Sequence, residues 1–246
     1  MSITTGIEWC DATWNPWMGC ARVSPGCAHC YMFTEQRRYG HDPEVVRRSK
    51  TLFHAPLRWT EPRLVFTCSW SDWFIPKADE WRDEAWDVIR QTPHLTYQIL
   101  TKRPELIPGR LPADWGAGWP NVWLGTSVEN RRFVERAEIL TEIPAAVRFL
   151  SCEPLLGPVD LDHVIWWEGP LGNRHLGGIQ WVIAGGESGP RARPCETDWL
   201  RSLRDQCQAA GVPFFLKQLG GHPDKRGHEK AVLDGRLWRE MPERAA

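Results

Sequence analysis

Short runs of apolar residues recur along the chain, and each run ends in small or polar residues. Six of them have the near-continuous apolar character of strands that are buried on both faces of a parallel sheet. They cover residues 64–69, 96–101, 122–127, 147–152, 181–186 and 213–218. A further segment, around Asn15–Gly19, is expected to form the first strand.

Amphipathic segments lie between several of these runs. Residues 79–91, 130–141 and 197–211 place apolar residues at helical spacing among charges, and Gly211 is well placed to end the last helix. Strand and helix alternate as in repeated βα units. Six or seven such units predict an α/β fold, an incomplete (β/α)6-type TIM-like barrel with parallel strands, because a full eight-fold barrel takes about 250 residues. An open doubly wound sheet is the alternative.

We expect one partial-barrel domain over residues 1–219 and a polar C-terminal extension over residues 220–246. Within the extension, residues 233–237 predict a small hairpin with an Asp-Gly turn.

Charge and composition narrow the class of protein. The formal net charge is -1, so a nucleic-acid partner would have to bind a local basic patch. The N-terminus lacks the features of a secretory signal, and no stretch reaches the roughly 18 apolar residues of a membrane span. We therefore expect a soluble, cytoplasmic protein with no membrane partner. In a reducing compartment, its eight cysteines favour metal or redox chemistry over a disulfide framework.

The chain has 16 tryptophans but only 3 tyrosines. Buried aromatic residues normally serve packing, so most of these indoles are expected in the core. The alternative is a stacking surface for a planar substrate.

The ends of the predicted strands carry many polar residues. In barrels, active sites lie at the C-terminal ends of strands. Singly, such residues also cap helices, but a set that converges on one rim favours a functional site. They are Ser69, Asp72, Thr101, Lys102, Ser127, Glu129, Asn130, Ser151, Cys152, Glu153, Glu187, Ser188, Lys217 and Gln218. Gly185 and Gly186 follow a strand, where glycine lets a ligand approach the backbone closely.

Three cysteines lie close together near the N-terminus. Cys20, Cys27 and Cys30 have the spacing C-x6-C-x2-C, and Tyr31 follows the last. A structural zinc site would need a fourth ligand, from Cys10, His29 or Cys68. Three buried thiols without a metal fit poorly in a loop of Ser, Pro, Gly and His. Thiolates are the normal ligands of iron–sulfur clusters, and three of them on a 4Fe-4S cluster leave one iron open.

A three-cysteine loop that ends in C-x2-C-aromatic and precedes repeated βα units resembles the radical S-adenosylmethionine superfamily. The commonest spacing there is C-x3-C-x2-C, so this chain departs from it in the first gap. The whole chain is also similar to a group of bacterial and bacteriophage-associated proteins. That similarity rests on Trp14-Asn15-Pro16, Ser-Pro-Gly-Cys at 24–27, Ser151-Cys152-Glu153-Pro154 and Gly-Gly-Glu-Ser-Gly at 185–189.

The superfamily resemblance implies two cofactors, a 4Fe-4S cluster on the three cysteines and S-adenosyl-L-methionine on its open iron. An external one-electron donor of the flavodoxin or ferredoxin type would reduce the cluster, and a 5′-deoxyadenosyl radical would abstract hydrogen from the substrate. The implied cofactor contacts are Tyr31, Ser69, Asp72, Ser127, Glu129, Ser151, Gly185 and Gly186. The candidate catalytic residues are Cys152, Glu153, Glu187 and Lys217.

Cys152 or Cys68 is a candidate hydrogen-atom donor, as in the spore photoproduct lyase branch, and the alternative for each is a small buried hydrophobe.

The favoured substrate is nucleic acid, as a DNA lesion such as a pyrimidine photoproduct or as a base to be modified. Basic residues support it, interleaved with tryptophans. They are Arg37, Arg38, Arg47, Arg48, Lys50, Arg131, Arg132, Arg136, Arg191 and Arg193. The alternatives are a radical enzyme that acts on a small molecule or peptide, and a non-enzymatic module that binds zinc or a cluster.

Overall fold

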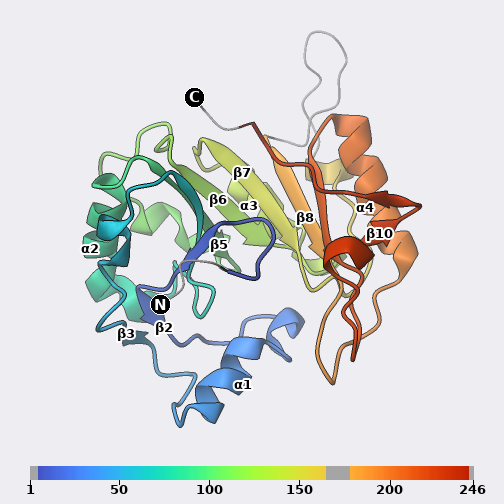
Figure 1. Cartoon of the computed structure of the whole chain (residues 1–246). Helices are drawn as coiled ribbons and strands as arrows, with labels where there is room; N and C mark the ends of the chain where they lie inside the picture. Colours follow the sequence, from blue (N-terminus) through green and yellow to red (C-terminus); the bar gives the residue numbers. More distant parts are fainter. Residues whose placement is uncertain (1–4, 165–177, 244–246) are drawn as a thin grey trace. The chain divides into compact units, whose positions relative to one another are not determined.

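The computed structural model describes residues 5–164 and 178–243 and has an α/β fold (Figure 1). Seven strands are hydrogen-bonded in the order β1-β4-β5-β6-β7-β8-β9. Every strand pair whose register is described in this sheet is parallel. The strands are β1 (Ala12–Trp14), β4 (Arg63–Thr67), β5 (Leu95–Thr101), β6 (Val122–Ser127), β7 (Val147–Cys152), β8 (Trp181–Gly185) and β9 (Phe214–Gln218).

The six apolar runs are confirmed as strands, but the expected first strand is wrong. The sheet strand is β1, which pairs with β4 and ends at Trp14. Pro16 has no backbone N–H with which to continue a ladder. The next residues, β2 (Trp17–Met18), pair instead with the antiparallel β3 (Arg47–Arg48) outside this sheet.

The α-helices are α1 (Tyr31–Arg38), α2 (Asp79–Arg90), α3 (Glu135–Thr141) and α4 (Thr197–Ala210). The predicted helix at 130–141 begins later than expected, because Asn130 caps a 3-10 turn by accepting a hydrogen bond from the Arg132 N–H. Helix α4 ends where predicted, at Gly211 with a left-handed φ of 68°. The 3-10 turns are Pro25–Cys27, Ala55–Arg58, Pro76–Ala78, Pro104–Leu106, Pro108–Arg110, Arg131–Phe133, Asp162–Val164 and His228–Lys230.

The chain divides into two compact units, and the division falls within β6. The first unit is Met1–Leu124 with Ile143–Ala146, and the second is Gly125–Glu142 with Val147–Ala246. The segment after residue 219 thus belongs to the same unit as β7–β9. The Leu216 N–H donates to the Trp238 carbonyl at 2.8 Å, which ties the end of the chain to β9.

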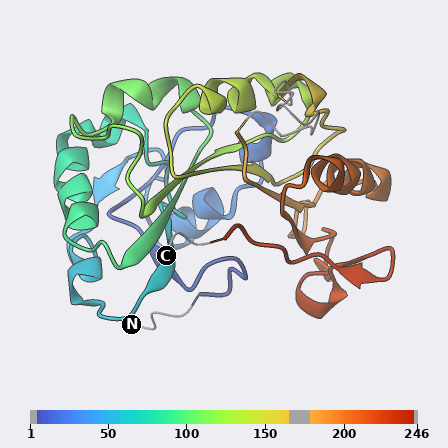
Figure 2. The same ribbon diagram turned by 90° about the horizontal axis from the view of Figure 1, so that it is seen from above.

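The predicted C-terminal hairpin is confirmed as β10 (Val232–Leu233) and β11 (Arg236–Leu237). Asp234 and Gly235 form its turn with φ of 52° and 79°, as a two-residue turn of this kind requires. The hairpin lies beside α4 in both views, where Arg201 and Arg204 donate to the Asp234 carboxylate (Figure 1 and Figure 2).

Indoles dominate the core of the first unit. Trp14, Trp17, Trp73 and Trp86 are fully buried. Neighbouring rings among them have centroids 5.0–5.7 Å apart. Such contacts add to the energy of buried area, and the packing interpretation is confirmed for these residues.

In the second unit, the ring of Phe149 lies against β6. A Cβ at Gly125 would stand 2.3 Å from that ring, so glycine is required there. Among the helices that the structure describes, none combines the length and the apolar character that a bilayer crossing requires.

Candidate functional site

The cysteines lie on a loop whose two ends are joined. We call residues 19–46, which lie between the paired strands β2 and β3, the cysteine loop. Gly19 opens it with a φ of 98°, and a Cβ there would stand 2.3 Å from the Val45 carbonyl oxygen at the other end. A side chain at Gly19 would therefore force the two ends of the loop apart.

The start of the cysteine loop is fixed to the residues that follow β4. The Gly19 N–H donates to the Trp70 carbonyl at 3.0 Å, and the Ser71 hydroxyl donates to the Gly19 carbonyl at 2.5 Å. Cys20 is thereby held near the C-terminal end of β4, the edge of the sheet at which we expected chemistry.

All eight cysteines are free thiols; of the three in the motif, Cys27 is buried and Cys20 and Cys30 are partly exposed. The pKa of Cys20 is raised to about 12, mainly by burial and also by the Asp72 charge, while the Arg103 guanidinium opposes the rise. Burial also raises the pKa of Cys30. Cys27 lies close enough to Cys20 and Cys30 for its charge to raise the pKa of both thiols. Without a metal, Cys20 and Cys30 are therefore protonated at neutral pH, and a metal would have to displace their protons.

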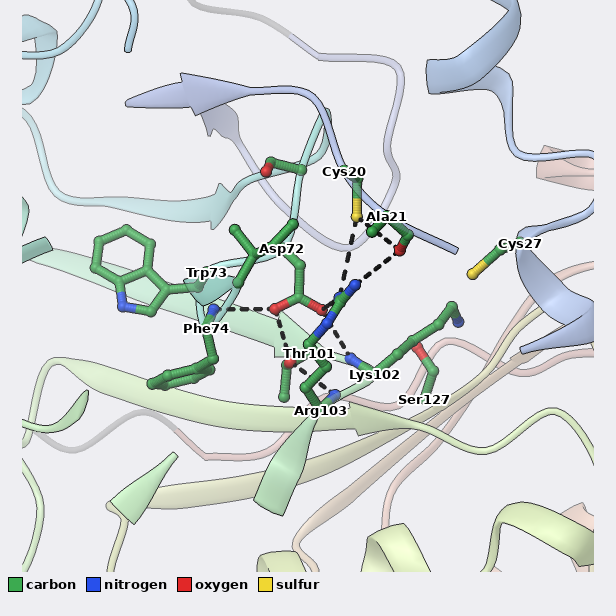
Figure 3. Close-up of polar contacts among 12 residues, drawn as sticks. Cys20, Ala21, Cys27, Asp72, Trp73, Phe74, Thr101, Lys102, Arg103 and Ser127 are labelled. Atoms are coloured by element: carbon green, nitrogen blue, oxygen red, sulfur yellow. Dashed lines mark hydrogen bonds and ion pairs between the residues drawn. The ribbon is translucent and has the colours of Figure 1, made fainter. Parts of the chain in front are cut away.

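Asp72 is the centre of a buried hydrogen-bond network in the first unit (Figure 3). One carboxylate oxygen accepts from the Phe74 N–H at 2.9 Å and the Thr101 hydroxyl at 2.8 Å. The other accepts from the Lys102 N–H at 3.1 Å and from Arg103 Nη1 at 2.8 Å. The four hydrogen bonds that Asp72 accepts hold the end of β5, and its predicted contact with a cofactor stays a prediction.

Ser69 and Tyr31 are brought together at the end of β4. The Tyr31 hydroxyl donates to the Ser69 carbonyl, although its ring is half exposed. The Ser69 hydroxyl exchanges hydrogen bonds with the Asn15 side chain, whose Oδ1 also accepts from the Trp70 N–H. Asn15, which sequence reasoning passed over as a site residue, thus fixes the turn that carries Ser69.

The second unit pairs each of its predicted carboxylates with a cation. Glu129 is fully buried and accepts from Arg136 Nη1 at 2.9 Å, and Glu187 accepts from Arg193 Nη2 at 2.6 Å. Two predicted catalytic residues meet, since Lys217 Nζ donates to Glu153 Oε1 at 2.6 Å.

Ser127 and Ser151 make hydrogen bonds through their backbone carbonyls, and the role of their side chains stays a prediction. The Ser127 carbonyl accepts from Arg136 Nη1 at 3.1 Å, and the Ser151 carbonyl accepts from the Val128 N–H at 3.1 Å. A Cβ at Gly186 would stand 2.4 Å from the Leu219 carbonyl oxygen. The close approach that glycine permits at Gly186 is therefore to the protein's own backbone. At Gly185 a Cβ would have only ordinary contacts.

The two candidate hydrogen-atom donors differ in their surroundings. Cys152 is fully buried and lies close enough to Cys207 of α4 that its charge adds to the rise that burial causes in the pKa of Cys207. Cys68 is also buried, has a left-handed φ of 53°, and lies close enough to Cys20 for a charge on Cys20 to add to the rise that burial and Asp72 cause in the pKa of Cys68. Cys68 therefore belongs to the cysteine site.

One family model matches almost the whole chain, over residues 4–242, and is described as a protein of unknown function (DUF5131). The chain belongs to this family. No curated protein and no solved structure matches it. The function therefore has to be inferred from the residues of the site.

The donor set of this DUF5131 chain fits a cluster in its chemistry, since Cys27 is the neighbour of both other thiols in the motif. Across residues 5–164 and 178–243, no group of three or more His, Cys, Asp or Glu side chains is already placed to hold a metal ion. The present positions of these side chains do not test metal binding, because cysteine side chains can change rotamer when a metal binds.

Several of the basic side chains are engaged within the protein. Arg48 forms a bidentate ion pair with Glu84 at 2.6 Å, and Arg136 and Arg193 hold Glu129 and Glu187. Other basic residues of the predicted set are exposed: Arg37, Arg38, Lys50, Arg131, Arg132 and Arg191.

Proposed function

We propose that this protein is a radical S-adenosylmethionine enzyme whose Cys20, Cys27 and Cys30 hold a 4Fe-4S cluster. When bound, the cluster and S-adenosylmethionine supply a 5′-deoxyadenosyl radical from one electron delivered by a flavodoxin or ferredoxin. The proposal includes an incomplete (β/α)6-type barrel as the scaffold and the cytoplasm as the compartment.

One observation carries the proposal: the cysteine loop is fixed at the C-terminal ends of parallel strands. Hydrogen bonds from Ser71 and Arg103 hold Gly19 and Ala21, which flank Cys20, against the segments that follow β4 and β5. In βα folds this edge of the sheet is where catalytic groups gather. A thiol trio at this edge is better explained by chemistry than by packing.

The other residues of the proposed site would position the cofactor and the substrate, exclude water and transfer protons. The Ser69 hydroxyl, fixed by Asn15, is the proposed polar contact for the cofactor near Cys20. In the second unit, Lys217, which donates a hydrogen bond to Glu153 Oε1, and Glu153 are the proposed pair for proton exchange with a substrate. Ser127, Glu129, Ser151 and Glu187 remain proposed polar contacts on strand ends.

The proposed substrate is nucleic acid, with DNA favoured. Its support is now confined to the exposed basic residues. Arg37 and Arg38 end α1, directly after the cysteines, and the Arg38 side chain is 77% exposed. Guanidinium groups bind phosphate through paired N–H donors, so this end of α1 would contact the backbone of a nucleic acid.

Anaerobic reconstitution with iron and sulfide tests the cluster. The wild-type protein should become brown, absorb near ~400 nm as thiolate-bound iron does, and form 5′-deoxyadenosine from S-adenosylmethionine and reductant. Cys30→Ala should lose the iron and the product, whereas Cys10→Ala, a buried cysteine of the same unit outside the motif, should keep both. Equal iron and equal product in wild type and Cys30→Ala would overturn the proposal.

A structural zinc site is the second candidate, because Cys68 lies near Cys20 and could complete a four-thiolate set. Cys68→Ala separates the two. It should abolish tight zinc binding if zinc is the native metal, but leave iron content unchanged if three cysteines hold a cluster. A colourless protein that retains one zinc per chain would decide for zinc.

The substrate is tested by adding DNA to the loaded enzyme. UV-irradiated DNA should increase 5′-deoxyadenosine over undamaged DNA of the same sequence if a photoproduct is the target. Arg37→Gln with Arg38→Gln should weaken the response to DNA and leave the basal cleavage of S-adenosylmethionine unchanged. No response to either DNA would leave the small-molecule alternative.

A further inference from the structure

Arg103 links the cysteine loop to the buried end of β5 (Figure 3). It is only 6% exposed and follows β5 by two residues. Its Nη2 donates to the Ala21 carbonyl at 2.7 Å, and its Nη1 donates to Asp72 Oδ2 at 2.8 Å. The same Nη1 lies 4.0 Å from the Cys20 sulfur.

Anchoring the loop explains only part of this arrangement. The Ala21 and Asp72 contacts hold the backbone next to Cys20, and a buried guanidinium needs such partners. The third contact aims an N–H of a permanent cation at the sulfur itself. A thiol is a weak acceptor, whereas a thiolate bound to a metal is a strong one, so this contact gains most when Cys20 carries a metal.

Asp72 controls how much positive charge the sulfur experiences. Its carboxylate accepts four hydrogen bonds and neutralises Arg103 from the side away from Ala21. The two side chains therefore act on the Cys20 sulfur with opposite signs: Arg103 stabilises negative charge there, and Asp72 opposes it.

We propose that Arg103 is a positioning residue for the cluster, which orients Cys20 through Ala21 and raises the reduction potential of the cluster by an N–H···S contact, with Asp72 as the opposing charge. This inference rests on the proposed function. Reduction adds negative charge to a cluster, so hydrogen bonds to its sulfurs and nearby positive charge favour the reduced form.

The test compares four variants after anaerobic reconstitution, with the midpoint potential followed by electron paramagnetic resonance. Arg103→Gln should shift the potential to more negative values, Asp72→Asn should shift it to more positive values, and Arg103→Lys should lie between Arg103→Gln and wild type. The control is Arg82→Gln, an equally buried arginine of the same unit whose partners are Asp79 and the carbonyls of Trp73 and Ile75. It should be destabilised but keep the wild-type potential.

A second measurement uses the metal-free protein. Hydrogen exchange of the amides at residues 19–30 should become faster in Arg103→Gln and stay at the wild-type rate in Arg82→Gln, because only the former loses the Ala21 anchor. Unchanged exchange there would overturn the positioning role even before a cluster is loaded.

The outcomes separate the inference from the proposed function. If wild type loads a cluster and Arg103→Gln and Asp72→Asn shift the potential in the same direction, or not at all, the inference is wrong and the proposed function stands. If wild type loads no iron–sulfur cluster while Cys68→Ala loses zinc, both are wrong.

Discussion

The two units use buried charge in different ways. In the first unit, Asp72 and Arg103 form one buried pair whose remaining hydrogen bonds reach out to backbone, to Thr101 and to the cysteine loop. In the second, Glu129 and Glu187 are each paired with an arginine that lies close in sequence. The Asp72–Arg103 pair joins segments that are distant in sequence, whereas each pair of the second unit neutralises a carboxylate with an arginine from the same segment.

The two units differ in which polar groups are still accessible to a ligand. In the first unit the Asp72 carboxylate is fully engaged, and the three thiols of the motif are the proposed metal ligands. In the second unit the Glu153–Lys217 pair is more accessible than the Glu129–Arg136 pair and is the better candidate for proton exchange. Three substitutions and one pKa titration test whether this difference in burial and connectivity also appears in stability.

The largest effect is expected for Asp72→Ala. It leaves Arg103 buried without its charge partner and removes four hydrogen bonds, so the free energy of unfolding should fall by about 3–5 kcal/mol. Urea denaturation measures it. Asp114→Ala is the control, because it breaks an exposed arginine pair of the same unit and should change the free energy of unfolding far less. Equal losses would remove the distinction between the two kinds of pair.

A smaller loss is expected for Glu129→Gln. The Glu129 carboxylate is fully buried, but the side chain of its partner Arg136 is slightly exposed. Water can therefore partly solvate the Arg136 guanidinium once the glutamate charge is removed. We expect a fall of about 2–3 kcal/mol in the free energy of unfolding. Glu135→Gln, on the exposed start of α3, should change it little. If Glu129→Gln lowers the free energy of unfolding as much as Asp72→Ala does, the additional hydrogen bonds of Asp72 do not contribute to stability.

Glu153→Gln should have a still smaller effect on stability. The pair with Lys217 is partly exposed on both sides, and a double-mutant cycle with Lys217→Met should give a coupling of about 1 kcal/mol or less. A coupling energy as large as the loss of unfolding free energy expected for Asp72→Ala would show that the Glu153–Lys217 pair is structural. It would remove the pair as a candidate for proton exchange.

The smallest effect concerns Asp234 at the hairpin. Its contacts with Arg201 and Arg204 lower its pKa from 3.8 to about 2. A lowered folded-state pKa adds stability that is complete above the unfolded pKa and is lost as the pH falls through the folded one, here between about pH 4 and pH 2. NMR titration of the carboxyl carbon measures the pKa. High salt should move it back towards the usual value, because the pair is exposed; no response to salt would argue against the ion pairs as the cause.

The sequence predicted the strands well because each is buried on both faces and carries a clear apolar run. It failed at β1, a three-residue strand whose Ala-Thr-Trp sequence is too short to have a period. The hairpin was predictable, since its Asp-Gly turn is a local backbone preference.

The site was less predictable, because its contacts join residues far apart in sequence. The cysteine motif and the polar strand ends can be read directly, but Arg103 lies 82 residues from Ala21, and no pattern indicates that they meet. Arg136 and Arg193 had a signal that we did not use, since each follows its glutamate by only seven and six residues.

The joined ends of the cysteine loop have a consequence for limited proteolysis. Arg22 is exposed and is a site for trypsin, and cleavage there would put Cys20 on one fragment and Cys27 and Cys30 on the other. The short fragment would still pair through β1 with β4 and through β2 with β3. A metal bound by all three thiols would then be a further link between the two fragments, in addition to these strand pairs.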